Sequence, residues 1–184
     1  MTIARAENSV LAVVDIQEKL APAMNPDVRR EVLAGVGVLL QAAETLDVPV
    51  IATEQYPKGL GATLPEVSDQ FPQNVQVLSK DSFSCCGESA FSGALEATGR
   101  SQVVLLGMEA HVCVLQTALE LRGAGYTPFV AEDGICSRRA DHKENALHRL
   151  RSNGVQVANV ESILFEWLQQ AGTDSFKKLA RLIR

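Results

Sequence analysis

The chain has 184 residues, and its length, composition and charge exclude several classes of protein. Hydrophobic residues make up 46% and charged residues 21%, which is ordinary for a soluble globular protein. The formal net charge of −5 argues against nucleic acid or an anionic membrane as a partner, since both favour a basic face. No apolar run approaches the roughly 20 residues of a membrane span, and the N-terminus lacks a signal-peptide pattern. We therefore expect one cytoplasmic domain over residues 1–184.

Short apolar runs rich in β-branched residues alternate with longer segments of helical periodicity. The runs lie at residues 10–14, 48–52, 75–78, 103–106, 128–131 and 155–158. Polar and apolar residues mostly do not alternate within them, which is typical of strands buried on both faces of a parallel sheet. The sequence therefore predicts an α/β fold with three layers, α/β/α, in which helices cover both faces of a six-stranded parallel sheet.

Capping residues mark the ends of several helices between these strands. Asn25 is a predicted N-cap with Pro26 at the first helical position, and Gly123 and Gly154 follow predicted helix ends. The other predicted helices cover about 89–97, 111–122, 138–153, 162–170 and 175–182. A long loop over 54–72 follows the second strand, and long loops in compact domains are often functional.

Three reactive side chains follow strand ends, where the ligand site of such a sheet is expected. Asp15 closes the first strand, Lys80 closes the third, and Cys113 lies in the first turn of the helix after the fourth. Taken singly, each is more simply a turn former, a solvated lysine or a small core residue. Together they supply a nucleophilic thiol, an ammonium that favours its anion, and a carboxylate that can take the thiol proton. We therefore expect Cys113 to have a lowered pKa.

The segments around these residues resemble the isochorismatase-like cysteine hydrolases. Residues 13–17 (VVDIQ) resemble the opening D-x-Q strand, 79–84 (SKDSFS) the central lysine segment, and 107–114 (GMEAHVCV) the nucleophile turn. The resemblance covers essentially the whole chain and implies the Rossmann-like hydrolase fold of that family. Residues 53–61 (TEQYPKGLG) are similar to the branch of small isochorismatase domain-containing proteins, whose substrates are generally undefined.

The resemblance implies that Asp15, Lys80 and Cys113 form a catalytic triad that hydrolyses a small amide-like substrate at a non-peptide C–N bond through a thioester. It also implies a cis peptide between Met108 and Glu109, with the backbone amides of Glu109 and Cys113 as the oxyanion hole. We further expect a homo-oligomer, a dimer or larger. The expected substrate pocket includes Gln17, Glu54, Tyr56 and Phe83, with Leu60 completing an apolar wall.

We expect no metal and no other cofactor. Nicotinamidases of this family bind a metal through an Asp and histidines after the second strand, whereas residues 54–58 here read EQYPK, without a histidine. His111 is expected to be structural or to line the pocket, because its side chain diverges from that of Cys113 at a spacing of two on a helix. The other cysteines, Cys85, Cys86 and Cys136, are expected to be reduced packing residues.

Two other interpretations remain open at this point. A catalytically silent member of the family, acting as an interaction or regulatory protein, would keep the same fold and the same residues. A nucleotide-binding Rossmann-like domain fits less well, because no G-x-G-x-x-G follows the first strand.

Overall fold

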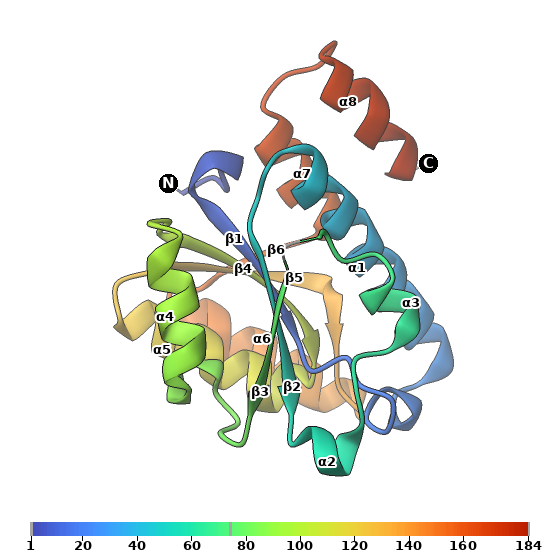
Figure 1. Ribbon diagram of the computed structural model, residues 1–184, viewed down its shortest axis with the longest axis vertical. Helices are drawn as coiled ribbons and strands as arrows, with labels where there is room; N and C mark the ends of the chain where they lie inside the picture. Colours follow the sequence, from blue (N-terminus) through green and yellow to red (C-terminus); the bar gives the residue numbers. More distant parts are fainter. Residues whose placement is uncertain (1, 74, 184) are drawn as a thin grey trace.

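Six parallel strands form one sheet in the computed structural model, which describes residues 2–73 and 75–183 (Figure 1). The order across the sheet is β3-β2-β1-β4-β5-β6, so the chain winds outward in both directions from β1. The strands are β1 (Ser9–Val14), β2 (Val50–Gln55), β3 (Gln76–Lys80), β4 (Gln102–Met108), β5 (Thr127–Cys136) and β6 (Gln156–Ala158). This arrangement confirms the predicted α/β fold with a six-stranded parallel sheet.

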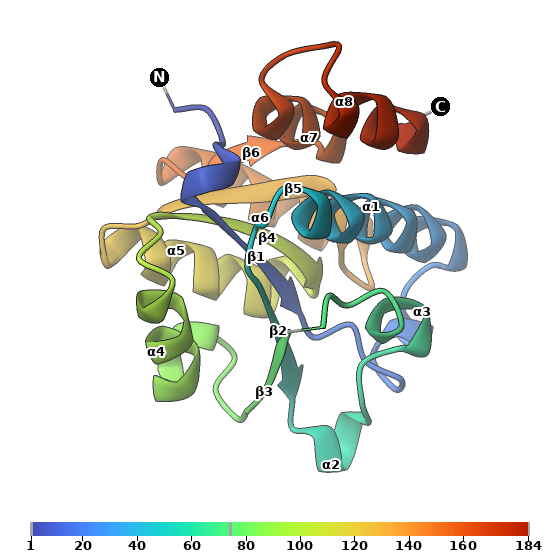
Figure 2. The same cartoon turned by 45° about the horizontal axis from the view of Figure 1, so that its top comes forward.

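Helices cover both faces of this sheet (Figures 1 and 2). One face packs against α1 (Pro26–Thr45), α7 (Val160–Leu168) and α8 (Asp174–Leu179), and the other against α4 (Ser89–Ala97), α5 (Leu115–Gly123) and α6 (Ala140–Ser152). Two short helices, α2 (Pro57–Leu60) and α3 (Pro65–Ser68), interrupt the long loop after β2. None of the helices in the described ranges is both long and apolar enough to cross a membrane.

Local sequence signals explain where these elements begin and why they pack. The Asn25 side chain accepts hydrogen bonds from the backbone N–H groups of Asp27 and Val28, so α1 begins at Pro26 as predicted. Every residue of β1 and of β4 is buried, which is the expected pattern for central strands covered on both faces.

Two elements differ from the prediction at the edge where the site lies. The predicted helix over 111–122 begins instead as a π-helical turn, Ala110–Val114, and continues as α5. Strand β5 runs to Cys136, five residues past the expected end, because its pairing with β4 resumes after an irregularity between Leu105 and Gly107. The extension brings the segment after Cys136 to the same edge of the sheet as Cys113.

Candidate active site

The reactive side chains predicted from the sequence gather at the carboxyl edge of the sheet. Asp15 directly follows β1 with a positive φ of 52°, a conformation that Asp adopts more readily than most residues. Lys80 is the last residue of β3 and pairs in register with Gln55, the last residue of β2. Cys113 lies in the π-helical turn after β4. The structure thus brings together the three residues that the sequence singled out.

A glycine allows β4 and β1 to meet closely beside Asp15. Gly107 has a φ of 124°, and a Cβ there would lie 2.0 Å from the carbonyl oxygen of Val14. Any other residue would push the strands apart at the point where the chain turns toward Cys113. The peptide bond between Met108 and Glu109 is cis, as the family resemblance implied.

Asp15 and Lys80 form a buried ion pair. Lys80 Nζ lies 2.8 Å from Asp15 Oδ2, and the two side chains are 1% and 0% exposed. Nζ also donates to Gln55 Oε1 at 2.6 Å and to the carbonyl oxygens of Ser82 and Phe83 at 3.1 and 3.0 Å. Burial alone would lower the pKa of Lys80, but the attraction of the nearby Asp15 charge outweighs it, so the pKa is raised. Lys80 is therefore held as an ammonium.

The two carboxylate oxygens of Asp15 have different surroundings. Oδ1 accepts a hydrogen bond of 2.8 Å from Thr53 Oγ1. Oδ2 is buried and is close to Lys80 Nζ, yet within the described chain it accepts no well-aligned hydrogen bond. The short distance gives electrostatic attraction, whereas the alignment leaves a lone pair of Oδ2 available for a proton donor.

The expectation that Cys113 has a lowered pKa is wrong for this structure. Burial of the thiol, followed by the neighbouring Asp15 charge, raises the pKa of Cys113 to about 12, and the opposing effect of Lys80 is smaller. The ammonium of Lys80 is already paired with Asp15, so its attraction for a thiolate is largely offset. Cys113 is a neutral thiol at pH 7, and ionising it requires a base.

A small cavity adjoins these residues. Its volume is about 100 Å³, well below the roughly 300 Å³ at which ordinary ligand pockets begin. Its walls are largely apolar, with polar groups near the thiol, and are formed by Asp15, Leu20, Gln55, Leu60, Phe83, Glu109, Val112 and Cys113. Such a space fits a molecule of a few heavy atoms, or one end of a longer molecule.

Only one of the four side chains expected in the pocket lines this cavity. Phe83 does so, together with the expected wall residue Leu60. Gln17 is instead fully buried and bonds the backbone of Gln55 and Gly61. Glu54 accepts hydrogen bonds from the backbone and hydroxyl of Thr63, and Tyr56 is 55% exposed. The expectation for Gln17, Glu54 and Tyr56 was wrong because the 56–64 loop folds back onto Gln17, through a bridge between Gln17 and Thr63.

Sequence reasoning missed several residues of the wall. Gln55 could have been found from the sequence, because it lies between the expected residues Glu54 and Tyr56. In the structure it pairs in register with Lys80. Leu20 and Val112 carry no chemical signal that separates them from core residues. Glu109 was expected to contribute only its backbone amide, but its side chain also lines the cavity and bonds Arg138 Nε at 3.1 Å.

The remaining cysteines and His111 lie outside the cavity wall. Cys85 and Cys136 are buried, Cys86 is partly buried, and all are free thiols. His111 Nδ1 is 2.9 Å from Ser137 Oγ and its ring packs on that of another histidine, which fits a structural role. In the described ranges, no three His, Cys, Asp or Glu side chains cluster in a way that would hold a metal ion.

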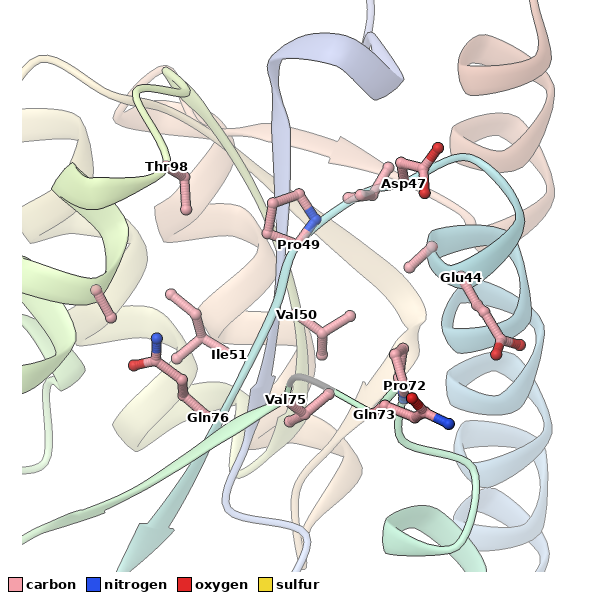
Figure 3. Close-up of a pocket in the computed structure, with 13 residues that line it drawn as sticks. Glu44, Asp47, Pro49, Val50, Ile51, Pro72, Gln73, Val75, Gln76 and Thr98 are labelled. Carbon is pink, nitrogen blue, oxygen red and sulfur yellow. The ribbon is translucent and has the colours of Figure 1, made fainter.

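A wider hollow lies at the opposite end of the strands (Figure 3). Its volume is about 470 Å³, and it is bounded by the beginnings of β2 and β3 and the end of α1, with Pro49, Val50 and Val75 on its wall. It is larger than the cavity at Cys113. The cavity at Cys113 is the better candidate, because a nucleophile, a carboxylate and an ammonium converge there.

The six-stranded parallel sheet, with helices on both faces, makes the chain an α/β protein, and Asp15, Lys80 and Cys113 lie at the carboxyl edge of that sheet. The chain belongs to the isochorismatase family, because the sequence model of the isochorismatase domain matches residues 9–162. Isochorismatase domain-containing protein 2 of Danio rerio is 36% identical over 177 residues, which cover 96% of this chain and 87% of that protein.

Solved structures agree with this assignment. The structure described as the MAR1 ribonuclease of Caenorhabditis elegans superposes with a TM-score of 0.93 and 32% identity, covering 99% of this chain and 92% of the other. The YcaC gene product of Escherichia coli, described as an octameric hydrolase of unknown specificity, gives a TM-score of 0.90 at 22% identity, covering 99% and 91%. The second comparison supports the fold alone.

Proposed function

We propose that this protein is a cysteine-dependent hydrolase that cleaves a non-peptide C–N bond in a small amide-like substrate. The observation that carries the proposal is a neutral thiol, Cys113, at the wall of a small cavity next to a buried carboxylate with a free lone pair. A buried, perturbed group beside a charge partner in a cavity is a typical functional arrangement.

The proposed reaction has two steps. In the first, Cys113 Sγ attacks the substrate carbonyl carbon while its proton passes to Asp15 Oδ2. The C–N bond then breaks, the same proton goes to the leaving nitrogen, and a thioester remains. In the second, a water molecule gives a proton to Asp15 and its oxygen attacks the thioester carbon. The C–S bond breaks, the proton returns to Sγ, and the carboxylic or carbamic acid leaves.

Lys80 and two backbone amides would stabilise the charges that develop. Lys80 stays protonated, holds Asp15 in place and favours the thiolate as it forms. The N–H groups of Glu109 and Cys113 are the proposed oxyanion hole, since they belong to the turn that carries the nucleophile. We propose no metal and no cofactor in either step.

The proposed function also includes the size of the substrate and the oligomeric state of the protein. The cavity of about 100 Å³ favours a small molecule over a polymer or a nucleotide, although a relative of similar sequence is described as a ribonuclease. We also propose that the protein assembles as a homo-oligomer. The octameric description of the E. coli protein with the same fold supports this, without fixing the number of subunits.

The test is a screen of small amides and carbamoyl compounds with wild type and Cys113→Ala, with RNA as a separate substrate. We expect hydrolysis of a small amide by wild type and its loss in a folded Cys113→Ala protein. Hydrolysis that survives Cys113→Ala would end the thiol mechanism. RNA cleavage without amide hydrolysis would overturn the substrate class. Absence of all turnover would favour the catalytically silent alternative.

A further inference from the structure

Gln55 presents a hydrogen-bond acceptor to the cavity that holds Cys113. Its side chain lines the cavity, and its Oε1 lies 4.0 Å from Cys113 Sγ. A carbonyl carbon attacked by the thiol must come next to Sγ, so the groups bonded to that carbon lie within reach of Oε1. Gln55 is therefore placed to contact the substrate at the bond that breaks.

The orientation of the Gln55 carboxamide is fixed by its neighbours. Oε1 accepts from Lys80 Nζ at 2.6 Å, and Nε2 donates to the carbonyl oxygen of Asp81 at 2.8 Å. An ammonium can only donate and a carbonyl can only accept, so a flipped amide would set donor against donor and acceptor against acceptor. The atom that faces Cys113 is consequently an oxygen.

The backbone of Gln55 is held as firmly as its side chain. Gln17 Oε1 accepts from the Gln55 N–H at 2.8 Å, and Gln17 Nε2 donates to the Gln55 carbonyl oxygen at 3.0 Å. Gln17 is fully buried, so these bonds are shielded from water. This explains how Gln17, outside the cavity, still contributes to its geometry: it is a positioning residue for Gln55.

One lone pair of Gln55 Oε1 remains for a ligand. Lys80 takes one of the two, and the thiol at 4.0 Å is at most a weak donor. The wall residues Leu20, Leu60 and Phe83 are apolar and offer no side-chain donor. A substrate N–H would satisfy this acceptor, whereas an ester oxygen in the same place would face it with another lone pair.

We propose that Gln55 Oε1 accepts a hydrogen bond from the N–H of a carboxamide or ureido substrate, and thereby selects amides over esters of the same shape. This inference rests on the proposed function, because it assumes that the cavity at Cys113 holds the substrate. It adds a specificity-determining residue and narrows the substrate to compounds with an N–H on the attacked carbonyl.

The first test compares a primary amide with the methyl ester of the same acyl group. In Gln55→Met, which keeps the chain length but removes the acceptor, the amide-to-ester ratio of kcat/KM should fall about tenfold from the wild-type value. Any disturbance of Lys80 affects both substrates and cancels in the ratio. Gln76→Met, at the other end of β3, is the matched control and should leave the ratio unchanged. Equal loss on amide and ester would overturn the inference.

A second test does not depend on turnover. The binding of the amide and of the ester to Cys113→Ala, which cannot form the thioester, is followed by calorimetry. The amide should bind about tenfold more tightly than the ester, and Gln55→Met in the same background should abolish the difference. An ester that binds as tightly as the amide would overturn the inference even if the Gln55→Met variant fails to fold. Preference for the amide without any hydrolysis by wild type would retain the inference about Gln55 and reject the proposed function.

Discussion

Replacing Lys80 by methionine tests the electrostatic arrangement on which the proposed site depends. The Nζ–Oδ2 distance to Asp15 is 2.8 Å, and neither side chain is more than 1% exposed. Removing one partner of such a pair leaves a buried charge unpaired, which costs about 3–5 kcal/mol. Methionine fills nearly the same space as the lysine stem, so little of this cost comes from a cavity. We therefore expect Lys80→Met to lose about 3–5 kcal/mol of unfolding free energy at pH 7.

The measurement is urea denaturation, followed by circular dichroism and by fluorescence of Trp167. This residue is the only tryptophan of the chain and is buried in α7, with its indole N–H bonded to Ser9 Oγ. With an m-value of about 2 kcal/mol/M, the midpoint should fall by about 1.5–2.5 M. The double variant Asp15→Asn/Lys80→Met removes the unpaired charge and should recover most of the loss.

A surface pair provides the control. Arg30 and Asp27 are 2.9 Å apart, almost the same distance as Lys80 and Asp15, but their side chains are 75% and 78% exposed. Arg30→Met should leave the midpoint unchanged, because exposed pairs contribute little. The reasoning is refuted if Lys80→Met behaves like Arg30→Met, or if the double variant is no more stable than Lys80→Met.

Three further predictions concern the same site. The folded-state pKa of Cys113 is about 12, above its ordinary value of 9.0, so the stability that it contributes is complete below pH 9 and is lost as the pH rises toward 12. The urea midpoint of wild type should therefore fall relative to that of Cys113→Ala over this range, and a constant difference would contradict the burial argument. Thr53→Val removes the donor to Asp15 Oδ1, and should cost about 1–3 kcal/mol of stability and reduce kcat/KM about tenfold; unchanged kinetics would show that Thr53 does not position Asp15. Activity should survive exhaustive chelation, and loss restored by one equivalent of a divalent ion would contradict the metal-free reaction.

Much of the fold followed from the sequence because its signals are local. The six apolar runs mostly do not alternate, which predicted strands covered on both faces, and all six correspond to strands of the sheet. Coverage on both faces is wrong for the edge strand β3, most of whose residues are exposed. Asn25 and Pro26 predicted the start of α1 because capping depends on a few neighbouring atoms. Asp15, Lys80 and Cys113 could be predicted to lie close together because the carboxyl ends of parallel strands meet at one edge of the sheet.

The rest of the site depends on side-chain directions, which strand order does not determine. Glu54 and Gln55 are adjacent on β2 and therefore point to opposite faces, so only one of them lines the cavity. The direction of Gln17 depends on where the 56–64 loop folds, and that is set by contacts distant in the chain. The predicted direction of the Cys113 pKa shift was wrong because the sequence shows neither that the thiol is buried nor that the charge of Lys80 is already paired with Asp15.

The neutral state of Cys113 gives the proposed mechanism a consistent charge balance. Before reaction, the Asp15 carboxylate and the Lys80 ammonium cancel, and the thiol adds no charge. Moving the thiol proton to Asp15 leaves a thiolate beside the same ammonium, so the net charge of the buried site is again zero. A thiolate already present at rest would instead give two anions and one cation in a site with little water, which burial strongly disfavours. The Lys80 ammonium therefore balances the anion both before and after the proton transfer, first on Asp15 and then on Cys113. This charge balance explains why a lysine fixed by acceptors from Gln55, Ser82 and Phe83 is buried beside a cysteine whose pKa is raised.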